Sequence, residues 1–189
     1  VGEVNASIPL LRKLLDEYTD SEFLVTTSTP TGSDILLSKL GNKVKHQYVP
    51  LDIPFCINLF LNTWKPKALI LLETEIWPNI VHCCKKKHIV TALVNARLSE
   101  KSKSKYLRFS AIIRPAINSL DLILAQYESD ADRFNEIVAD KKIKLCGNLK
   151  FDQDIPKELE SISGSIRDSW SIEGKRRPTL IAASTHEGE

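Results

Sequence analysis

The chain has 189 residues, of which 42% are hydrophobic and 26% charged, a balance typical of a soluble globular protein with one well-formed core. Its formal net charge of +2 is too small for a protein that follows a nucleic-acid backbone, so we expect no nucleic-acid partner. The four cysteines form no CxxC pair, which favours a reducing compartment, and no apolar run approaches the length of a membrane span.

Short β-branched runs alternate with amphipathic segments of helical period, which is the pattern of stacked βαβ units. We therefore predict an α/β fold with a Rossmann-like, doubly wound parallel sheet. A first helix is expected over residues 8–18, with Pro9 in its first turn. The predicted strands are residues 23–27, 43–49, 68–72, 89–94, 122–125 and 142–146. The predicted helices between them are residues 33–40, 54–64, 78–87, 102–119 and 129–138.

The character of the chain changes after residue 152. Residues 155–170 predict a polar helix, residues 174–178 a basic linker, and residues 179–183 a new strand. We assign residues 1–150 to a first domain, 151–178 to an interdomain helix and linker, and 179–189 to the first strand and loop of a second domain. Because the sequence has no methionine and stops soon after an apolar run, we expect both ends to be cuts within a longer polypeptide.

Ligands of open α/β sheets bind beyond the carboxyl ends of the strands, so the loops there are the first candidates for a site. The loop after residues 68–72 contains Glu73, Glu75 and Trp77 directly before a predicted helix. A helix start offers free N–H groups and a partial positive charge, which favour carboxylates and anionic ligands. The alternative is a capping arrangement before Pro78.

Three further segments at this edge carry candidate binding groups. Arg97, in residues 95–99, offers a planar fork suited to a carboxylate or phosphate, and the alternative is an ion pair with a nearby acid. Residues 26–32 form a hydroxyl-lined turn that suits either phosphate binding or helix capping, but they lack the P-loop pattern. Residues 147–152 begin with Gly-Asn, which is also compatible with turn chemistry alone.

The charge pattern leaves the role of one basic segment open, and the cysteine and histidine pattern argues against a metal site. Between Lys85 and Arg108 the chain has eight basic residues and a single acid, which indicates either a solvated face or a contact with anionic lipid or a phosphorylated acceptor. Cys84 and His88 have the spacing of two ligands on one helix face, but no second ligand pair is present, so we predict no metal site.

These motifs together resemble the 3-deoxy-D-manno-octulosonic acid (Kdo) transferase family of lipopolysaccharide synthesis. Seven blocks carry the resemblance in order along the chain: residues 1–3 (VGE), 26–32 (TTSTPTG), 48–52 (YVPLD), 73–79 (ETEIWPN), 95–99 (NARLS), 147–152 (GNLKFD) and 183–189 (ASTHEGE). The resemblance implies a GT-B architecture, in which residues 1–150 form the amino-terminal, acceptor-binding half. Residues 179–189 would then begin the donor domain for CMP-Kdo.

The resemblance also implies a reaction and a place for it. Kdo would pass from CMP-Kdo to a lipid A precursor by an inverting single displacement, without a metal ion or other cofactor. The enzyme would work at the cytoplasmic face of the bacterial inner membrane, held there peripherally or by an anchor preceding Val1. As an isolated piece the chain is expected to be inactive.

Site roles follow from the same resemblance. Glu3 is expected to be the catalytic base, with Glu75 and Glu73 orienting the acceptor or supporting the transition state. A helix start would lower the pKa of Glu3 and weaken it as a base, and the sequence leaves the net effect open. The expected acceptor-binding residues are Gly2, Thr29, Thr31, Gly32, Trp77, Asn79, Arg97, Lys101 and Lys103. The expected donor-binding residues are Ser184, Thr185, His186 and Glu187.

Two other function classes remain open at this level. One is another GT-B enzyme that acts on a nucleotide sugar, such as a hexosyltransferase or an epimerase, since this scaffold serves several activities. The other is a non-catalytic module that binds an anion or a lipid head group.

Overall fold

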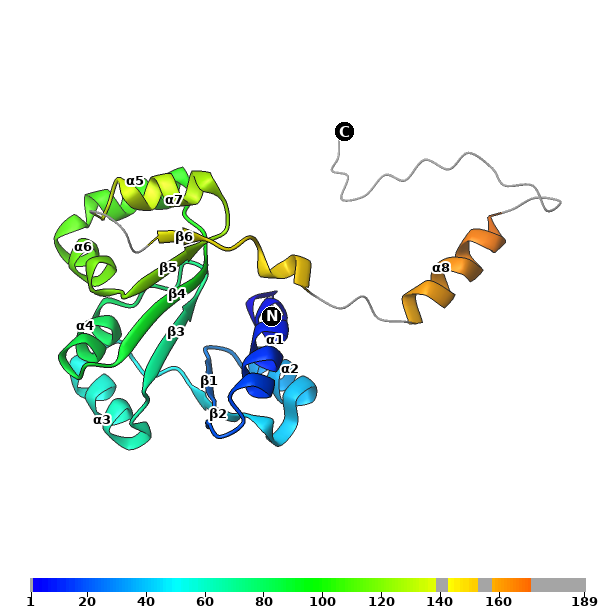
Figure 1. Cartoon of the computed structure of the whole chain (residues 1–189), viewed down its shortest axis with the longest axis horizontal. Helices are drawn as coiled ribbons and strands as arrows, with labels where there is room; N and C mark the ends of the chain where they lie inside the picture. The colour runs from blue at the N-terminus through cyan, green and yellow to red at the C-terminus, as the bar shows by residue number, and fades with distance from the viewer. Residues whose placement is uncertain (1, 139–142, 153–157, 171–189) are drawn as a thin grey trace. The chain divides into compact units, whose positions relative to one another are not determined.

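The computed structural model describes residues 2–138, 143–152 and 158–170 (Figure 1). The chain divides into two compact units, residues 1–153 and 154–189. The first contains the described strands, and the second contains one described helix, α8 (Glu158–Ser169), in the segment where the sequence predicts a polar helix. The predicted linker, the strand at residues 179–183 and the four donor-binding residues lie outside the described residues.

The strands form two parallel sheets with helices around them, which confirms the predicted α/β class (Figure 1). Two strands pair in the smaller sheet, and the larger sheet has the order β3-β4-β5-β6. Each of the six strands predicted between residues 23 and 146 has a counterpart that starts within two residues of the expected position. The strands are β1 (Leu24–Thr27), β2 (Lys45–Tyr48), β3 (Ala68–Leu72), β4 (Val90–Ala96), β5 (Leu122–Ala125) and β6 (Ile143–Leu145).

Three of the helices begin on a proline, whose missing N–H costs nothing in the first turn. These are α2 (Pro30–Leu40), α3 (Pro54–Trp64) and α4 (Pro78–Lys86). The other helices of the first unit are α1 (Gly2–Glu17), α5 (Glu100–Arg108), α6 (Ser110–Ser119) and α7 (Glu128–Asn135), with short 3-10 turns η1 (Gly41–Lys43) and η2 (Leu149–Asp152). No described helix combines the length and the apolar character that a membrane crossing requires.

Two helix predictions depart most from the observed limits, while α2 also begins three residues before its predicted start and α7 ends three residues before its predicted end. The first helix begins at Gly2, so Pro9 lies in its interior, and the burial of Ala6, Ser7 and Ile8 stabilises the extra turns. The helix predicted over residues 102–119 is two helices that meet at Phe109 (φ −102°, ψ 31°). They have different partners, since α5 packs on α7 whereas α6 packs on α4, and one straight helix does not serve both.

Each sheet has its own core. The larger core lies between β3–β6 and their helices, and its fully buried members include Leu93, Ile117 and Phe134. Cys84 is also part of it, and burial raises the pKa of its thiol to about 11, so this cysteine is a packing residue. The smaller core joins Ile8 of α1 to α2 and the β1–β2 sheet.

Candidate active site

Three carboxylates from two segments interact electrostatically near the end of β3. Glu73 and Glu75 follow β3, and Glu3 lies in the first turn of α1. Partial burial raises the pKa of Glu3 above its ordinary value, and the charges of Glu73 and Glu75 raise it further. The net shift of the Glu3 pKa is therefore upward. Among the described residues, no three His, Cys, Asp or Glu side chains are grouped so that they could hold a metal ion.

The backbone of the Glu73–Glu75 loop is fixed from two sides. Glu73 has a left-handed φ of 55°, which is uncommon for a residue other than glycine and is often found at functional sites. Its N–H donates to the carbonyl of Val94 at 3.0 Å. The Tyr106 hydroxyl on α5 donates to the carbonyl of Thr74 at 3.2 Å. Burial, and then the charge of Glu75, raise the pKa of Tyr106, so it stays a neutral donor.

Trp77 orients the Glu75 side chain. Its indole N–H donates to Glu75 Oε2 at 2.9 Å, while its ring packs partly against the larger core. The hydrogen bond restricts the exposed Glu75 carboxylate to one side of the loop. Trp77 was predicted to contact the acceptor, and the structure gives it this contact with a candidate catalytic residue.

The start of α4 is capped by Asp52, from the YVPLD block, and not by the glutamates that precede it. Asp52 accepts hydrogen bonds from the backbone N–H of Asn79 at 3.1 Å and of Ile80 at 2.9 Å. The Asn79 side-chain amide also donates to the Asp52 carbonyl at 2.6 Å. Asn79, predicted to bind the acceptor, therefore joins α4 to the loop before α3, and Glu73 and Glu75 are left for other contacts.

Removal of this cap should cost stability. We expect Asp52→Ala to lower the free energy of unfolding by about 0.5–2 kcal/mol, the usual cost of losing an N-terminal cap. Asp52→Asn keeps an oxygen acceptor and should lose clearly less. Chemical denaturation of both variants measures the difference, and equal losses would mean that the hydrogen bonds to Asn79 and Ile80 are not the cause.

The hydroxyl-lined turn caps α2 and lies beside α1. Thr29 Oγ1 accepts from the N–H of Gly32 at 3.2 Å, and the Thr31 hydroxyl donates to Thr29 at 3.4 Å. A Cβ on Gly32 would stand only 3.1 Å from Thr29 Oγ1, so glycine leaves room for the capping hydroxyl, and it would make an ordinary contact with Val4 of α1 at 3.5 Å. Gly2, by contrast, has open space around the position of a Cβ. The turn therefore caps α2, as one of the two alternatives predicted, and it lies against α1 close to Glu3. Ligand binding by the same turn stays a prediction.

His46 completes this turn, although no sequence motif points to it. Its ring nitrogens lie 2.9 Å from Thr27 Oγ1 and 3.3 Å from Ser33 Oγ. His46 on β2 is in register with Val25 of β1, and its ring reaches Thr27, which lies 19 positions away along the chain. No local spacing indicates such a contact.

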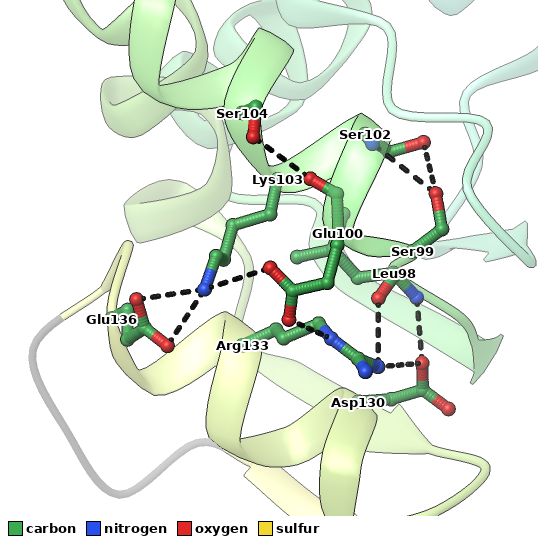
Figure 2. Close-up of polar contacts among 9 residues, drawn as sticks. All are labelled: Leu98, Ser99, Glu100, Ser102, Lys103, Ser104, Asp130, Arg133 and Glu136. Carbon is green, nitrogen blue, oxygen red and sulfur yellow. Dashed lines mark hydrogen bonds and ion pairs between the residues drawn. The ribbon is translucent and has the colours of Figure 1, made fainter.

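Arg97 is exposed. The residues that follow it are held in place by α7 (Figure 2). The next residue, Leu98, donates its N–H to Asp130 Oδ1 at 2.9 Å and accepts from Arg133 at 3.2 Å. Asp130 is 3% exposed and forms an ion pair with Arg133 at 3.6 Å. Ser99 then caps α5 by accepting from the Ser102 N–H at 3.2 Å. The exposed guanidinium of Arg97 thus projects from a fixed backbone.

Lys103 already has two acidic partners. Its ammonium lies 3.1 Å from Glu100 and 2.9 Å from Glu136, and Glu100 also pairs with Arg133 at 2.7 Å (Figure 2). This network joins α5 to α7. Lys103 was predicted to bind the acceptor, but its ammonium is directed at these carboxylates, whereas Lys101 on the same helix is exposed.

The sequence was compared with known families and proteins. A family model described as 3-deoxy-D-manno-octulosonic-acid transferase (kdotransferase) matches residues 1–153. A 3-deoxy-D-manno-octulosonic acid transferase of Haemophilus influenzae is 39% identical over the whole chain, which covers 44% of that protein. A probable mitochondrial enzyme of the same name from Arabidopsis thaliana is 33% identical, with 43% of its length covered. The chain therefore spans less than half the length of these relatives.

Solved structures show the same fold at low sequence identity. The UDP-GlcNAc 2-epimerase of Neisseria meningitidis, bound to UDP-GlcNAc, superposes with a TM-score of 0.56 at 16% identity, over 89% of this chain and 51% of the epimerase. The UDP complex of MnaA from S. aureus gives a TM-score of 0.57 at 15% identity, over 92% and 46% of the two chains. These neighbours are GT-B-like, and the match supports the amino-terminal half of that architecture.

Proposed function

Because the chain belongs to the 3-deoxy-D-manno-octulosonic acid transferase family, we propose that it is the acceptor-binding part of an enzyme that transfers Kdo from CMP-Kdo to a lipid A precursor. The relatives that it matches are more than twice as long, so the complete reaction belongs to a longer protein. Residues 1–153 alone should be inactive, since the proposed donor-binding residues Ser184, Thr185, His186 and Glu187 lie outside them.

In this proposal Glu3 is the general base of a single displacement. The acceptor hydroxyl oxygen forms a bond to the anomeric carbon of Kdo while the bond from that carbon to the phosphate oxygen breaks and CMP leaves. Glu3 takes the proton of the hydroxyl. The observation that carries the proposal is the raised pKa of Glu3, because a carboxylate with a higher pKa is a stronger base. No step in the proposal uses a metal ion.

Glu75 and Glu73 support this base in two ways. Their charges raise the pKa of Glu3, and they also place negative charge near the anomeric carbon, where positive charge develops in an oxocarbenium-like transition state. Trp77 holds Glu75 in place for this purpose. The two glutamates therefore act both on the base and on the reacting sugar.

The acceptor would lie across the neighbouring loops. Exposed Arg97 and Lys101 would bind its phosphates, and the turn of Thr29, Thr31 and Gly32 would contact its sugar beside Gly2 and Glu3. We place the enzyme at the cytoplasmic face of the bacterial inner membrane, where a lipid acceptor is presented. Asn79 bonds to Asp52 and Lys103 pairs with Glu136, so in this proposal both residues support the acceptor surface from within the protein.

The pH dependence of transfer gives a signed prediction. Glu3 works as a base only when ionised, so kcat should rise with pH through its raised pKa. In a Glu73→Gln, Glu75→Gln variant two charges that raise the pKa of Glu3 are lost. The acidic limb of the kcat–pH profile, where kcat rises with pH, should then move to lower pH. Measured kcat against pH tests this. If the acidic limb does not move, Glu73 and Glu75 do not influence the pKa of the catalytic base.

The function is tested by giving the full-length protein CMP-Kdo with a lipid A precursor and, separately, UDP-GlcNAc. The second substrate is included because the matched structures are UDP-GlcNAc 2-epimerases. We expect CMP release that depends on the lipid acceptor, and no epimerisation. Epimerisation without transfer would favour the other nucleotide-sugar enzyme, and binding of the lipid without turnover would favour a non-catalytic module.

A further inference from the structure

A buried asparagine connects the ends of the strands on the larger sheet. Asn95 lies near the end of β4, is 1% exposed, and has a left-handed φ of 55°, which asparagine tolerates better than most residues. Its carbonyl accepts from the Gln126 side chain after β5 at 2.9 Å. Its side-chain Oδ1 accepts from the N–H of Leu149 after β6 at 3.1 Å. One residue therefore fixes the segments after two neighbouring strands.

The bond to Leu149 leads to the helix that carries Glu3. Leu149 is the first residue of η2, and η2 packs against α1, as Figure 1 shows beside the amino terminus. These two segments are distant in sequence but belong to the same compact unit. The amide of Asn95 thus sets the place of η2, and η2 forms part of the surface on which α1 rests.

We propose that Asn95 is a positioning residue for Glu3, which it places against Glu73 and Glu75 by holding η2 under α1. The proposal rests on the role of Glu3 in the proposed function. A catalytic base must stand within hydrogen-bond reach of the proton that it accepts, so a small shift of α1 has a large effect on rate. Asn95 itself touches no reacting group.

The test uses Asn95→Gly in the full-length protein. Glycine adopts the left-handed φ without strain, so this variant removes the side-chain acceptor and leaves the backbone path unchanged. We expect kcat to fall about 100-fold, the scale of a misplaced catalytic group. The acidic limb of kcat should move to lower pH, because a Glu3 that leaves its partly buried place beside the other carboxylates loses what raises its pKa.

Thr91→Val is the matched control. Thr91 is a fully buried polar residue on the same strand, and its hydroxyl donates to Asp121 at 3.1 Å at the opposite end of β4. Its loss should lower stability but leave the acidic limb in place. A variant that is only less stable contains less folded enzyme, but the acidic limb of its kcat–pH profile stays at the same pH.

Amide hydrogen exchange makes the test independent of activity. In Asn95→Gly, exchange should become faster in residues 147–152 and in the first turns of α1, but not in α2. If the glycine variant does not fold, Leu149→Pro removes the donor of the same hydrogen bond at the first position of η2, where proline is tolerated. The proposal is overturned if α1 exchanges as in the parent, or if α1 loosens and the acidic limb stays fixed. Whether Glu3 is the base at all is tested separately, by the activity of a Glu3→Gln variant.

Discussion

Transfer by the full-length protein should fall by a factor of about 10²–10⁴ when Glu3 is replaced by glutamine, the range expected for loss of a general base. Glutamine has nearly the same shape as glutamate but cannot accept the proton. Because the Glu3 side chain stays largely in solvent, although it is partly desolvated in the first turn of α1, the fold should be unchanged. The KM values for CMP-Kdo and acceptor should change much less than kcat, and steady-state kinetics on both substrates measures this.

Glu17→Gln is the matched control for this experiment, since Glu17 is an exposed glutamate at the other end of the same helix. It should transfer Kdo at the rate of the parent. Near-normal turnover by Glu3→Gln would remove Glu3 from the role of base. The membership of the chain in the transferase family would not be affected by that result.

Asp130→Ala should lower the free energy of unfolding by about 1–3 kcal/mol, the cost of leaving a buried donor without its acceptor. The donor is the N–H of Leu98, which Asp130 binds at 2.9 Å from a side chain that is 3% exposed. Since the same contact fixes the loop that presents Arg97, the KM for the lipid acceptor should also rise. Denaturant unfolding and the acceptor KM test the two expectations separately.

Asp132→Ala provides the comparison, because Asp132 lies on the same helix and is exposed. It should be close to neutral in both measurements. An Asp130→Ala variant as stable as Asp132→Ala would show that the buried contact to Leu98 is not a significant part of the fold.

Periodicity along the chain predicted most of the fold, because it reports which face of each element is buried. Each described strand was expected, and parallel pairing follows from the helices between them. The errors came from tertiary packing. Burial of Ala6 to Ile8 extends α1 beyond what Pro9 suggests, and the separate partners of α5 and α6 break a helix that the local pattern leaves continuous.

The candidate site was predictable only where its residues belong to recognisable blocks. Glu3, Glu73 and Glu75 lie in such blocks, and the charges of Glu73 and Glu75 raise the pKa of Glu3. The residues that hold this neighbourhood together act across long sequence separations. Tyr106 reaches the Thr74 carbonyl over 32 positions, and Asp130 reaches Leu98 over 32. No motif or period links such pairs.

The fold alone does not distinguish a transferase from an epimerase. The matched epimerase structures share the architecture at 15–16% identity, while the transferase relatives share sequence over nearly the whole chain. The family assignment therefore depends on the shared sequence and not on the fold, because one scaffold can serve several activities.

The most direct measurement is the titration of the Glu3 carboxyl carbon by NMR in the full-length protein with labelled glutamate. We predict a pKa above the ordinary glutamate value, and a lower one when Glu73 and Glu75 are both replaced by glutamine. A Glu3 that titrates at or below its ordinary value, and does not respond to those replacements, would contradict the account of a base strengthened by its neighbours.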